Sequence, residues 1–410
     1  MVENRDLGTT LGEGEAPGRR QVRLFDLQGN HYEMGYQQGL QMREIIRHFF
    51  SHLRDLEVLR RAKPFFLPLN VYVSISARRA EREMMQEMAE LYPAQRARME
   101  GIAKGADVDE SLLCLALSLE TAIAGMDYRL GSCTAAGLEP GRSALGEAVV
   151  TKNYDQPLFF QPYYVTRLNR SAETASTLDV TLAPLPGCHD GINEHGLCVS
   201  CNRAHGTDLP TSSIPVGVLV QEVLERCATT EEAVAFLCAG KRASGAILLV
   251  ADAEGDMATV ELSPNFSGVR RPEGGVLINT NHYRYRGMLS YDVPRNAFYA
   301  GRTVPALRGL RVHESSEMRY ARAEQLLSGD EVFSLKDLLR VFSDHGESGR
   351  GDDNTVCRHG SYFSTTCSII MLPRSRRMLV TYGHPCNSVF TDFLDPFARE
   401  AEDAGGETEE

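Results

Sequence analysis

The chain has 410 residues, of which 42% are hydrophobic and 24% charged, and this balance is typical of a globular protein with a large core. Its net charge of −12 disfavours nucleic acid and anionic membranes as partners, and no apolar run approaches the roughly 18 residues that span a bilayer. Residues 1–21 lack the apolar segment of a signal peptide, so we expect a disordered leader, a cytoplasmic protein and reduced cysteines.

The first third of the chain has the pattern of helices. Apolar residues recur at helical spacing over residues 36–59 and again over residues 79–99. Asp107, with a glutamate three residues later, is expected to cap the start of a further helix. We therefore expect residues 22–132 to form a helical segment that packs onto the remainder of the fold.

From residue 133 onward the pattern changes to strands with helices between them. Short apolar and β-branched runs predict strands at residues 148–151, 164–166, 197–200, 246–251, 258–262, 276–279, 368–372 and 378–382. Helical spacing predicts helices over residues 216–239, with a break at 228–230, and at about 317–328 and 335–343. The sum is an α+β protein with stacked antiparallel sheets and helices outside, folded as one unit over residues 22–395 and ending in an acidic tail at 396–410.

Cys133 lies at this change of pattern, inside a segment of small residues at 131–137. Asp155 follows about one hairpin later. A cysteine that opens a strand-rich region, with an acidic residue downstream, suggests a chain that cleaves itself and then uses the freed cysteine as a nucleophile. A buried structural cysteine and a surface turn aspartate are the alternative interpretation of these two residues.

Several short motifs, read in order, resemble those of one known family. They are Gly29–Gly39, 101–106, 131–137, Asn153-Tyr154-Asp155, 191–197, Thr280-Asn281-His282, 344–345, 356–359 and 383–386. In these motifs the chain resembles the acyl-coenzyme A:6-aminopenicillanate (isopenicillin N) acyltransferase family of cysteine N-terminal nucleophile hydrolases. The resemblance implies a four-layer αββα sandwich and autocatalytic cleavage between Ser132 and Cys133. It also implies a helical α-subunit at 22–132, a catalytic β-subunit at 133–395 that stays associated with it, and action on acyl amide or acyl thioester bonds of small molecules.

The resemblance also implies roles for individual residues. Cys133 supplies the thiol nucleophile, and its own α-amine, with a reference pKa of about 7.7–8.0, serves as the general base. Asp155 orients that amine, Asn281 donates to the oxyanion, and Asn202 is a second oxyanion candidate. The expected substrate-binding residues are Asn153, Tyr154, His282 and Arg284. We expect no bound cofactor, although a coenzyme A thioester is a candidate acyl donor.

Two other functions stay open at this level. An uncleaved Cys-His thiol hydrolase or thioesterase would use His282 or His384 as its base, and a non-catalytic scaffold would bind a small ligand. Cys198 and Cys201 have the spacing of a zinc pair, but they lie in a predicted strand, where residues three apart face opposite sides. We therefore expect no metal site. Packing or hydrogen-bonding roles are expected for His345, His359 and His384.

Overall fold

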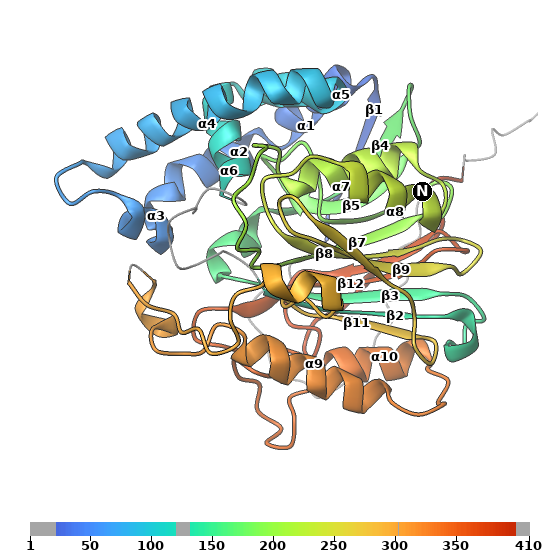
Figure 1. The fold of residues 1–410 in the computed structure, drawn as a ribbon. Helices are drawn as coiled ribbons and strands as arrows, with labels where there is room; N and C mark the ends of the chain where they lie inside the picture. The colour runs from blue at the N-terminus through green and yellow to red at the C-terminus, as the bar shows by residue number, and fades with distance from the viewer. Residues whose placement is uncertain (1–21, 120–131, 302, 399–410) are drawn as a thin grey trace, which may run out of the picture.

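The computed structural model describes residues 22–119, 132–301 and 303–398 (Figure 1). The expected leader and most of the acidic tail lie outside these residues. Within them, two β-sheets lie face to face and helices cover the outer side of each sheet. The predicted α+β class and the four-layer αββα arrangement are both confirmed.

The first sheet has eight strands in the spatial order β1-β4-β5-β6-β7-β8-β9-β10. Their bounds are β1 (Leu24–Gly29), β4 (Tyr164–Ser171), β5 (Thr177–Leu182), β6 (Asp190–Asn193), β7 (Cys198–Arg203), β8 (Ala246–Ala251), β9 (Met257–Leu262) and β10 (Ser267–Arg270). All neighbours pair antiparallel except β1, which runs parallel to β4.

The second sheet has six strands in the order β11-β2-β3-β12-β13-β14, and every pair is antiparallel. Their bounds are β11 (Val276–Asn279), β2 (Ser132–Leu138), β3 (Val149–Gln156), β12 (Ser364–Leu372), β13 (Arg377–Thr381) and β14 (Thr391–Phe393). Strands β2 and β3 are buried along their whole length because apolar layers cover both faces of the sheet. Any polar side chain in these strands therefore needs a partner inside the protein.

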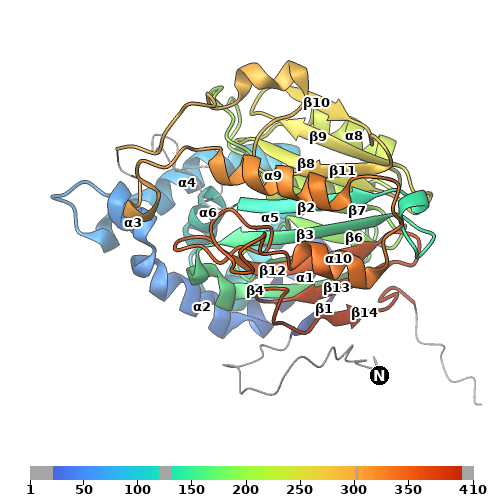
Figure 2. The same ribbon diagram turned by 90° about the horizontal axis from the view of Figure 1, so that it is seen from below.

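Helices form the two outer layers. On the first sheet they are α1 (His31–Gln41), α5 (Pro93–Ala106), α7 (Val216–Arg226) and α8 (Thr230–Ala239), and the layer extends to one side through α2 (Arg43–His52), α3 (Glu57–Ala62), α4 (Leu69–Leu91) and α6 (Glu110–Ser118). Figure 2 shows α9 (Glu314–Leu327) and α10 (Leu335–Phe342) lying across the second sheet. In the described part of the chain, none of these helices has the length and apolar character of a membrane span.

The glycines of the two N-terminal motifs bring α1 and α5 into backbone contact. A Cβ atom at Gly35 would lie 2.1 Å from the carbonyl oxygen of Arg98, and one at Gly39 would lie 2.3 Å from that of Ile102. Gly101 and Gly105 of α5 meet the carbonyls of α1 in the same way, at 2.2 Å each. These motifs thus have a structural explanation, because any side chain would force the two helices apart.

The predicted cap at Asp107 is wrong. Asp107 ends α5 in the left-handed conformation, with φ of 54°. The side chain that caps α6 belongs to Asp109, which accepts from the backbone nitrogen of Ser111 at 2.9 Å. Aspartate tolerates both positions, and only residues 107–109 connect the two helices, so the sequence pattern alone did not separate the two roles.

Candidate active site

Cys133 is the second residue of β2, in the interior of the second sheet. Its backbone lies opposite Tyr154 of β3, and the preceding Ser132 lies opposite Asp155. The Cys133 side chain is fully buried among the apolar residues between the two sheets. Burial raises the pKa of this thiol to about 11, against the effect of the nearby Lys152. In the uncleaved chain the thiol is therefore protonated at neutral pH and needs a base before it can react.

The backbone nitrogen of Cys133 is held by a side chain. It donates to Oδ1 of Asn281 at 3.0 Å, and the hydroxyl of Ser132 donates to the same oxygen at 2.9 Å. Asn281 stands two residues beyond β11, which pairs with β2, so the sheet itself brings the two segments together. The Nδ2 group of Asn281 donates to the carbonyl of Arg203 at 2.9 Å. The predicted site residue thus lies at Cys133 with its acceptor oxygen, rather than its donor nitrogen, directed at the cysteine.

Arg319 of α9 binds both sides of the Ser132–Cys133 bond. Its guanidinium donates to the hydroxyl of Ser132 at 2.6 Å and to the carbonyl of Cys133 at 2.5 Å, and it also reaches Thr134 and Asn281 at 2.8 and 2.9 Å. Sequence reasoning missed this residue. The signal was present, because the buried face of α9 carries an arginine among small and apolar residues at helical spacing: Ser316, Arg319, Ala323 and Leu327.

Asp155 is fully buried beside this cluster. Its Oδ1 accepts from the Thr365 hydroxyl at 2.8 Å, and its Oδ2 lies 3.9 Å from the guanidinium of Arg319. Oδ2 is buried and has no hydrogen-bond partner among the described residues. Burial raises the pKa of this carboxyl group, while Arg319 and Arg358 oppose the rise. Asp155 therefore has one acceptor oxygen to offer to a further donor near Ser132.

A buried ion pair joins the two sheets next to Cys133. The ammonium of Lys152 in β3 donates to both carboxylate oxygens of Asp190 in β6, at 2.8 and 2.7 Å, and to the carbonyl of Cys201 at 2.6 Å. It also lies 4.5 Å from the ring centre of Tyr154. Burial alone would lower the pKa of Lys152, but Asp190 outweighs it and the pKa is raised. Sequence reasoning missed this pair as well, although a lysine in the middle of a buried strand demands a partner.

The amide groups of the other two predicted asparagines are engaged with backbone carbonyls. Asn202 donates to the carbonyls of Asn279 and Thr280 at 3.0 and 3.1 Å, immediately before Asn281 in the chain. Asn153 donates to the carbonyls of Phe342 and Val356 at 2.8 and 2.9 Å. In this structure Asn202 shapes the segment that presents Asn281, and Asn153 holds the loops that follow α10.

His282 and Arg284 both contact side chains of α9. The His282 ring contacts the Ser316 hydroxyl at 2.8 Å, and burial lowers its pKa to about 3, so it is neutral. The guanidinium of Arg284 lies 4.4 Å from the ring centre of Tyr320 and lines a separate cavity of about 360 Å³. The structure therefore does not bring Arg284 into the cavity beside Cys133.

The cavity beside the cluster has a volume of about 260 Å³. It is lined by Ser132, Asn281 and Arg319 of the cluster, and further lining residues include Tyr299, Leu307, Leu310, Phe363, Asp353 and Arg358. It touches Ser132 but not the Cys133 thiol. A second, small cavity of about 20 Å³, lined by Tyr154, Phe160 and His189, lies on the other side of the sheet. Tyr154 lines this second cavity, which has room for about one water molecule, and its substrate-binding role stays a prediction.

The two stacked sheets between helical layers, with a cysteine near the start of an inner strand, are the architecture of the N-terminal nucleophile hydrolases. The sequence model of the family described as acyl-coenzyme A:6-aminopenicillanic acid acyl-transferase matches residues 144–387. Because this match spans more than half of the chain, the chain belongs to that family. The matched region begins after Cys133, so it includes Asp155, Asn202 and Asn281 but not the cysteine itself.

Similar solved structures are remote in sequence. An N-acylethanolamine-hydrolyzing acid amidase ortholog from Caenorhabditis elegans is 17% identical, with a TM-score of 0.40 over 59% of this chain and 93% of that chain. A conjugated bile acid hydrolase mutant from Clostridium perfringens is also 17% identical, with a TM-score of 0.40 over 65% and 93%. Penicillin V acylase from Agrobacterium tumefaciens is 16% identical, with a TM-score of 0.34 over 63% and 77%. No curated protein sequence matches the chain.

Proposed function

We propose that this chain is an autoproteolytic cysteine N-terminal nucleophile enzyme that acts on acyl amide or acyl thioester bonds of small molecules. The observation that carries the proposal is the hydrogen bond from the Cys133 backbone nitrogen to Asn281 Oδ1. Cleavage would turn this nitrogen into the catalytic amine, and its acceptor is already in place. Membership of the acyltransferase family supports the class of reaction.

In the proposed maturation step, the Cys133 sulfur attacks the carbonyl carbon of Ser132. The carbon–nitrogen bond between the two residues breaks, the nitrogen gains a proton, and a thioester joins Ser132 to the sulfur. Water then hydrolyses the thioester, which leaves a carboxylate on Ser132 and a free thiol on Cys133. Arg319 fixes the geometry of this step because it holds groups on both sides of the bond.

In the proposed turnover, the freed amine of Cys133 takes the thiol proton and the thiolate attacks the substrate carbonyl. Asp155 receives the amine on its buried Oδ2, which has no hydrogen-bond partner among the described residues, and Asn281 Oδ1 keeps its present contact with the nitrogen. Water would release the acyl group as an acid, and a second amine would carry it away in a transfer reaction. The oxyanion roles of Asn281 and Asn202 stay predictions, because their donor groups must first leave the carbonyls that they now bind.

The Cys-His alternative has less support. Among the described residues, no histidine is hydrogen-bonded to the Cys133 thiol. His282 is tied to Ser316, and the ring of His384 stacks on His359 with a centre-to-centre distance of 3.9 Å. Neither histidine therefore has the contact with Cys133 that a thiol-activating base needs.

Denaturing electrophoresis of the purified protein tests the proposal, with Cys133→Ala beside the wild type and Cys238→Ala as the control for loss of a different cysteine. Cleavage before Cys133 would divide the 45.3 kDa chain into pieces of about 15 kDa (132 of 410 residues) and about 31 kDa (278 of 410 residues). We expect wild type and Cys238→Ala to split and Cys133→Ala to stay whole. An intact wild type that hydrolyses an acyl amide would favour the Cys-His enzyme, and an intact, inert wild type would favour the scaffold.

The substrate class is tested with a panel of acyl amides and acyl thioesters, each with and without an added amine. Release of free acid in both conditions identifies a hydrolase. Formation of a new amide, at the expense of the acid, identifies an acyltransferase.

A further inference from the structure

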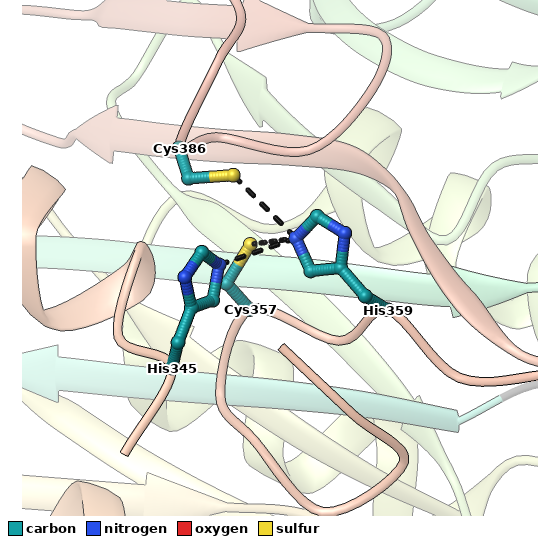
Figure 3. A group of neighbouring side chains, drawn as sticks. All are labelled: His345, Cys357, His359 and Cys386. Atoms are coloured by element: carbon teal, nitrogen blue, oxygen red, sulfur yellow. Dashed lines mark hydrogen bonds between the residues drawn. The ribbon is translucent and has the colours of Figure 1, made fainter. Parts of the chain in front are cut away.

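Four metal-binding side chains converge on one point beside the second sheet (Figure 3). They are His345, Cys357, His359 and Cys386, and all four ligand atoms lie within 4.8 Å of one another. Nε2 of His359 lies 3.2 Å from Nε2 of His345, 3.4 Å from the sulfur of Cys357 and 3.5 Å from the sulfur of Cys386. Figure 3 shows both sulfurs and both ring nitrogens directed at the space that they enclose.

Hydrogen bonds among the four groups do not account for this geometry. A neutral imidazole nitrogen either donates one hydrogen bond or accepts one in the plane of the ring. Nε2 of His359 nevertheless has three polar neighbours at contact distance. A cation at the centre would accept a lone pair from every one of these atoms at once, and it would need no proton on the ring nitrogens.

We propose that His345, Cys357, His359 and Cys386 form a structural zinc site. Two sulfurs and two imidazole nitrogens are the ligand set of tetrahedral zinc, with zinc–sulfur bonds of about 2.3 Å and zinc–nitrogen bonds of about 2.0–2.1 Å. A tetrahedron with these bonds places two nitrogens about 3.3 Å apart and a nitrogen and a sulfur about 3.6 Å apart. The distances from His359 lie close to these values. On binding, both thiols would lose their protons to solvent and become thiolates.

The number of ligands assigns the role of the metal. Four protein ligands fill a tetrahedral zinc, whereas a catalytic zinc keeps one position for water or substrate. The ligands come from two loops: the connection between α10 and β12 supplies His345, Cys357 and His359, and the connection between β13 and β14 supplies Cys386. The metal would therefore fasten these loops to each other, and it takes no part in the chemistry at Cys133.

The fastened loops also form part of the active-site cavity. Arg358 stands between the ligands Cys357 and His359, lines the 260 Å³ cavity and pairs with Asp353 at 3.0 Å. The backbone nitrogen of Arg358 donates a hydrogen bond to the hydroxyl of Thr365. That hydroxyl in turn donates to Asp155, so a chain of hydrogen bonds links Arg358 to Asp155. Zinc binding would thus fix the cavity wall nearest to Asp155.

This proposal replaces the expectation of no metal and of packing roles for His345 and His359. The sequence spacing hid the site, since its ligands at 345, 357, 359 and 386 do not form the two close pairs of common zinc motifs. The pair that has such spacing, Cys198 and Cys201, faces opposite sides of the first sheet, one in each of two core layers.

Metal analysis of the full-length protein tests the proposal. The protein is purified without chelators from zinc-supplemented medium, and its zinc content is measured by inductively coupled plasma mass spectrometry. We expect about one zinc per chain. Cys357→Ser and Cys386→Ser should lose most of it, and the matched control Cys238→Ser should keep it. A wild type without zinc that also gains none when titrated with zinc would overturn the proposal, as would full zinc content in both ligand variants.

A spectroscopic measurement on the wild type covers the case in which a ligand variant fails to fold. Cobalt exchanged for zinc should give the intense visible bands of a tetrahedral site and a thiolate-to-cobalt charge-transfer band, and His345→Gln should weaken both. A cobalt spectrum without thiolate bands would contradict the assigned ligands. A Cys357–Cys386 disulfide in the freshly purified protein, found by peptide mass spectrometry under non-reducing conditions, would also overturn the site.

Discussion

Replacement of Arg319 by alanine should destabilise the folded chain by about 3–5 kcal/mol, which is the typical cost of removing one partner of a buried ion pair. Arg319 is fully buried, and its guanidinium donates to Ser132, Cys133, Thr134 and Asn281. The variant removes the guanidinium donor from all four groups, although Asn281 Oδ1 keeps its hydrogen bonds from Ser132 and Cys133, and it leaves Asp155 without the cation that stands 3.9 Å away. The cost therefore has two sources, lost hydrogen bonds and an uncompensated buried carboxylate.

Urea unfolding at pH 7, followed by circular dichroism, measures this cost. All variants carry Cys133→Ala, so that cleavage of the chain does not alter the comparison. Arg340→Ala is the control, because Arg340 is 67% exposed in its ion pair, and its midpoint should move far less. Arg319→Lys should fall between the two, since it keeps the charge and loses the forked donor.

A second substitution separates the two sources of the cost. Asp155→Asn in the Arg319→Ala background should recover part of the lost stability, because it removes the uncompensated charge. Equal midpoints for Arg319→Ala and Arg340→Ala would refute the reasoning. A double variant that is less stable than Arg319→Ala would show that the carboxylate does not depend on the arginine.

Two further predictions concern Asp155 and Glu222. Asp155→Asn should lower kcat by at least about 10²-fold with little change in KM, because the substitution disturbs the catalytic amine and not the substrate pocket. An unchanged kcat would remove Asp155 from the mechanism. Burial raises the pKa of Glu222 from 4.5 to about 6, so the folded state binds this proton more tightly than the unfolded state, and stability falls as pH rises through that range. Glu222→Gln should therefore be more stable than wild type by about 2 kcal/mol at pH 8, from 1.5 pKa units at 1.36 kcal/mol each, and about equal to wild type at pH 4. Urea midpoints at the two pH values measure this difference. An equal difference in stability at both pH values would contradict the assignment of the raised pKa to Glu222.

The sequence predicts much of the fold because the signals involved are local. The break between α7 and α8, the hairpin of β8 and β9 and the hairpin of β12 and β13 all stand where apolar periodicity and turn residues place them. The cap at Asp107 failed for the same reason, since two aspartates in one short turn give nearly the same local signal.

The candidate site depends on contacts between distant segments, and here the sequence predicts less. The resemblance to the acyltransferase family selects Cys133, Asp155 and Asn281, and the structure places all three around the Ser132–Cys133 bond. The resemblance does not identify Arg319. This residue stands 186 residues beyond Cys133 in the chain and reaches it only through the packing of α9 on β2.

The orientation of a side chain is also beyond sequence reasoning. The family motif identifies Asn281 as a site residue, but only the structure shows that its Oδ1 accepts from Cys133 while its Nδ2 donates to Arg203. The cluster around His359 is a similar case, because two loops must fold against each other before its four ligand atoms meet.

The mass and N-terminal sequence of the larger fragment test the central claim most directly. The account predicts a polypeptide that begins at Cys133 with a free α-amine in the wild type, and no such fragment in Cys133→Ala. A fragment that begins at any other residue, or cleavage of Cys133→Ala at the same bond, would contradict the assignment of Cys133 as the self-released nucleophile.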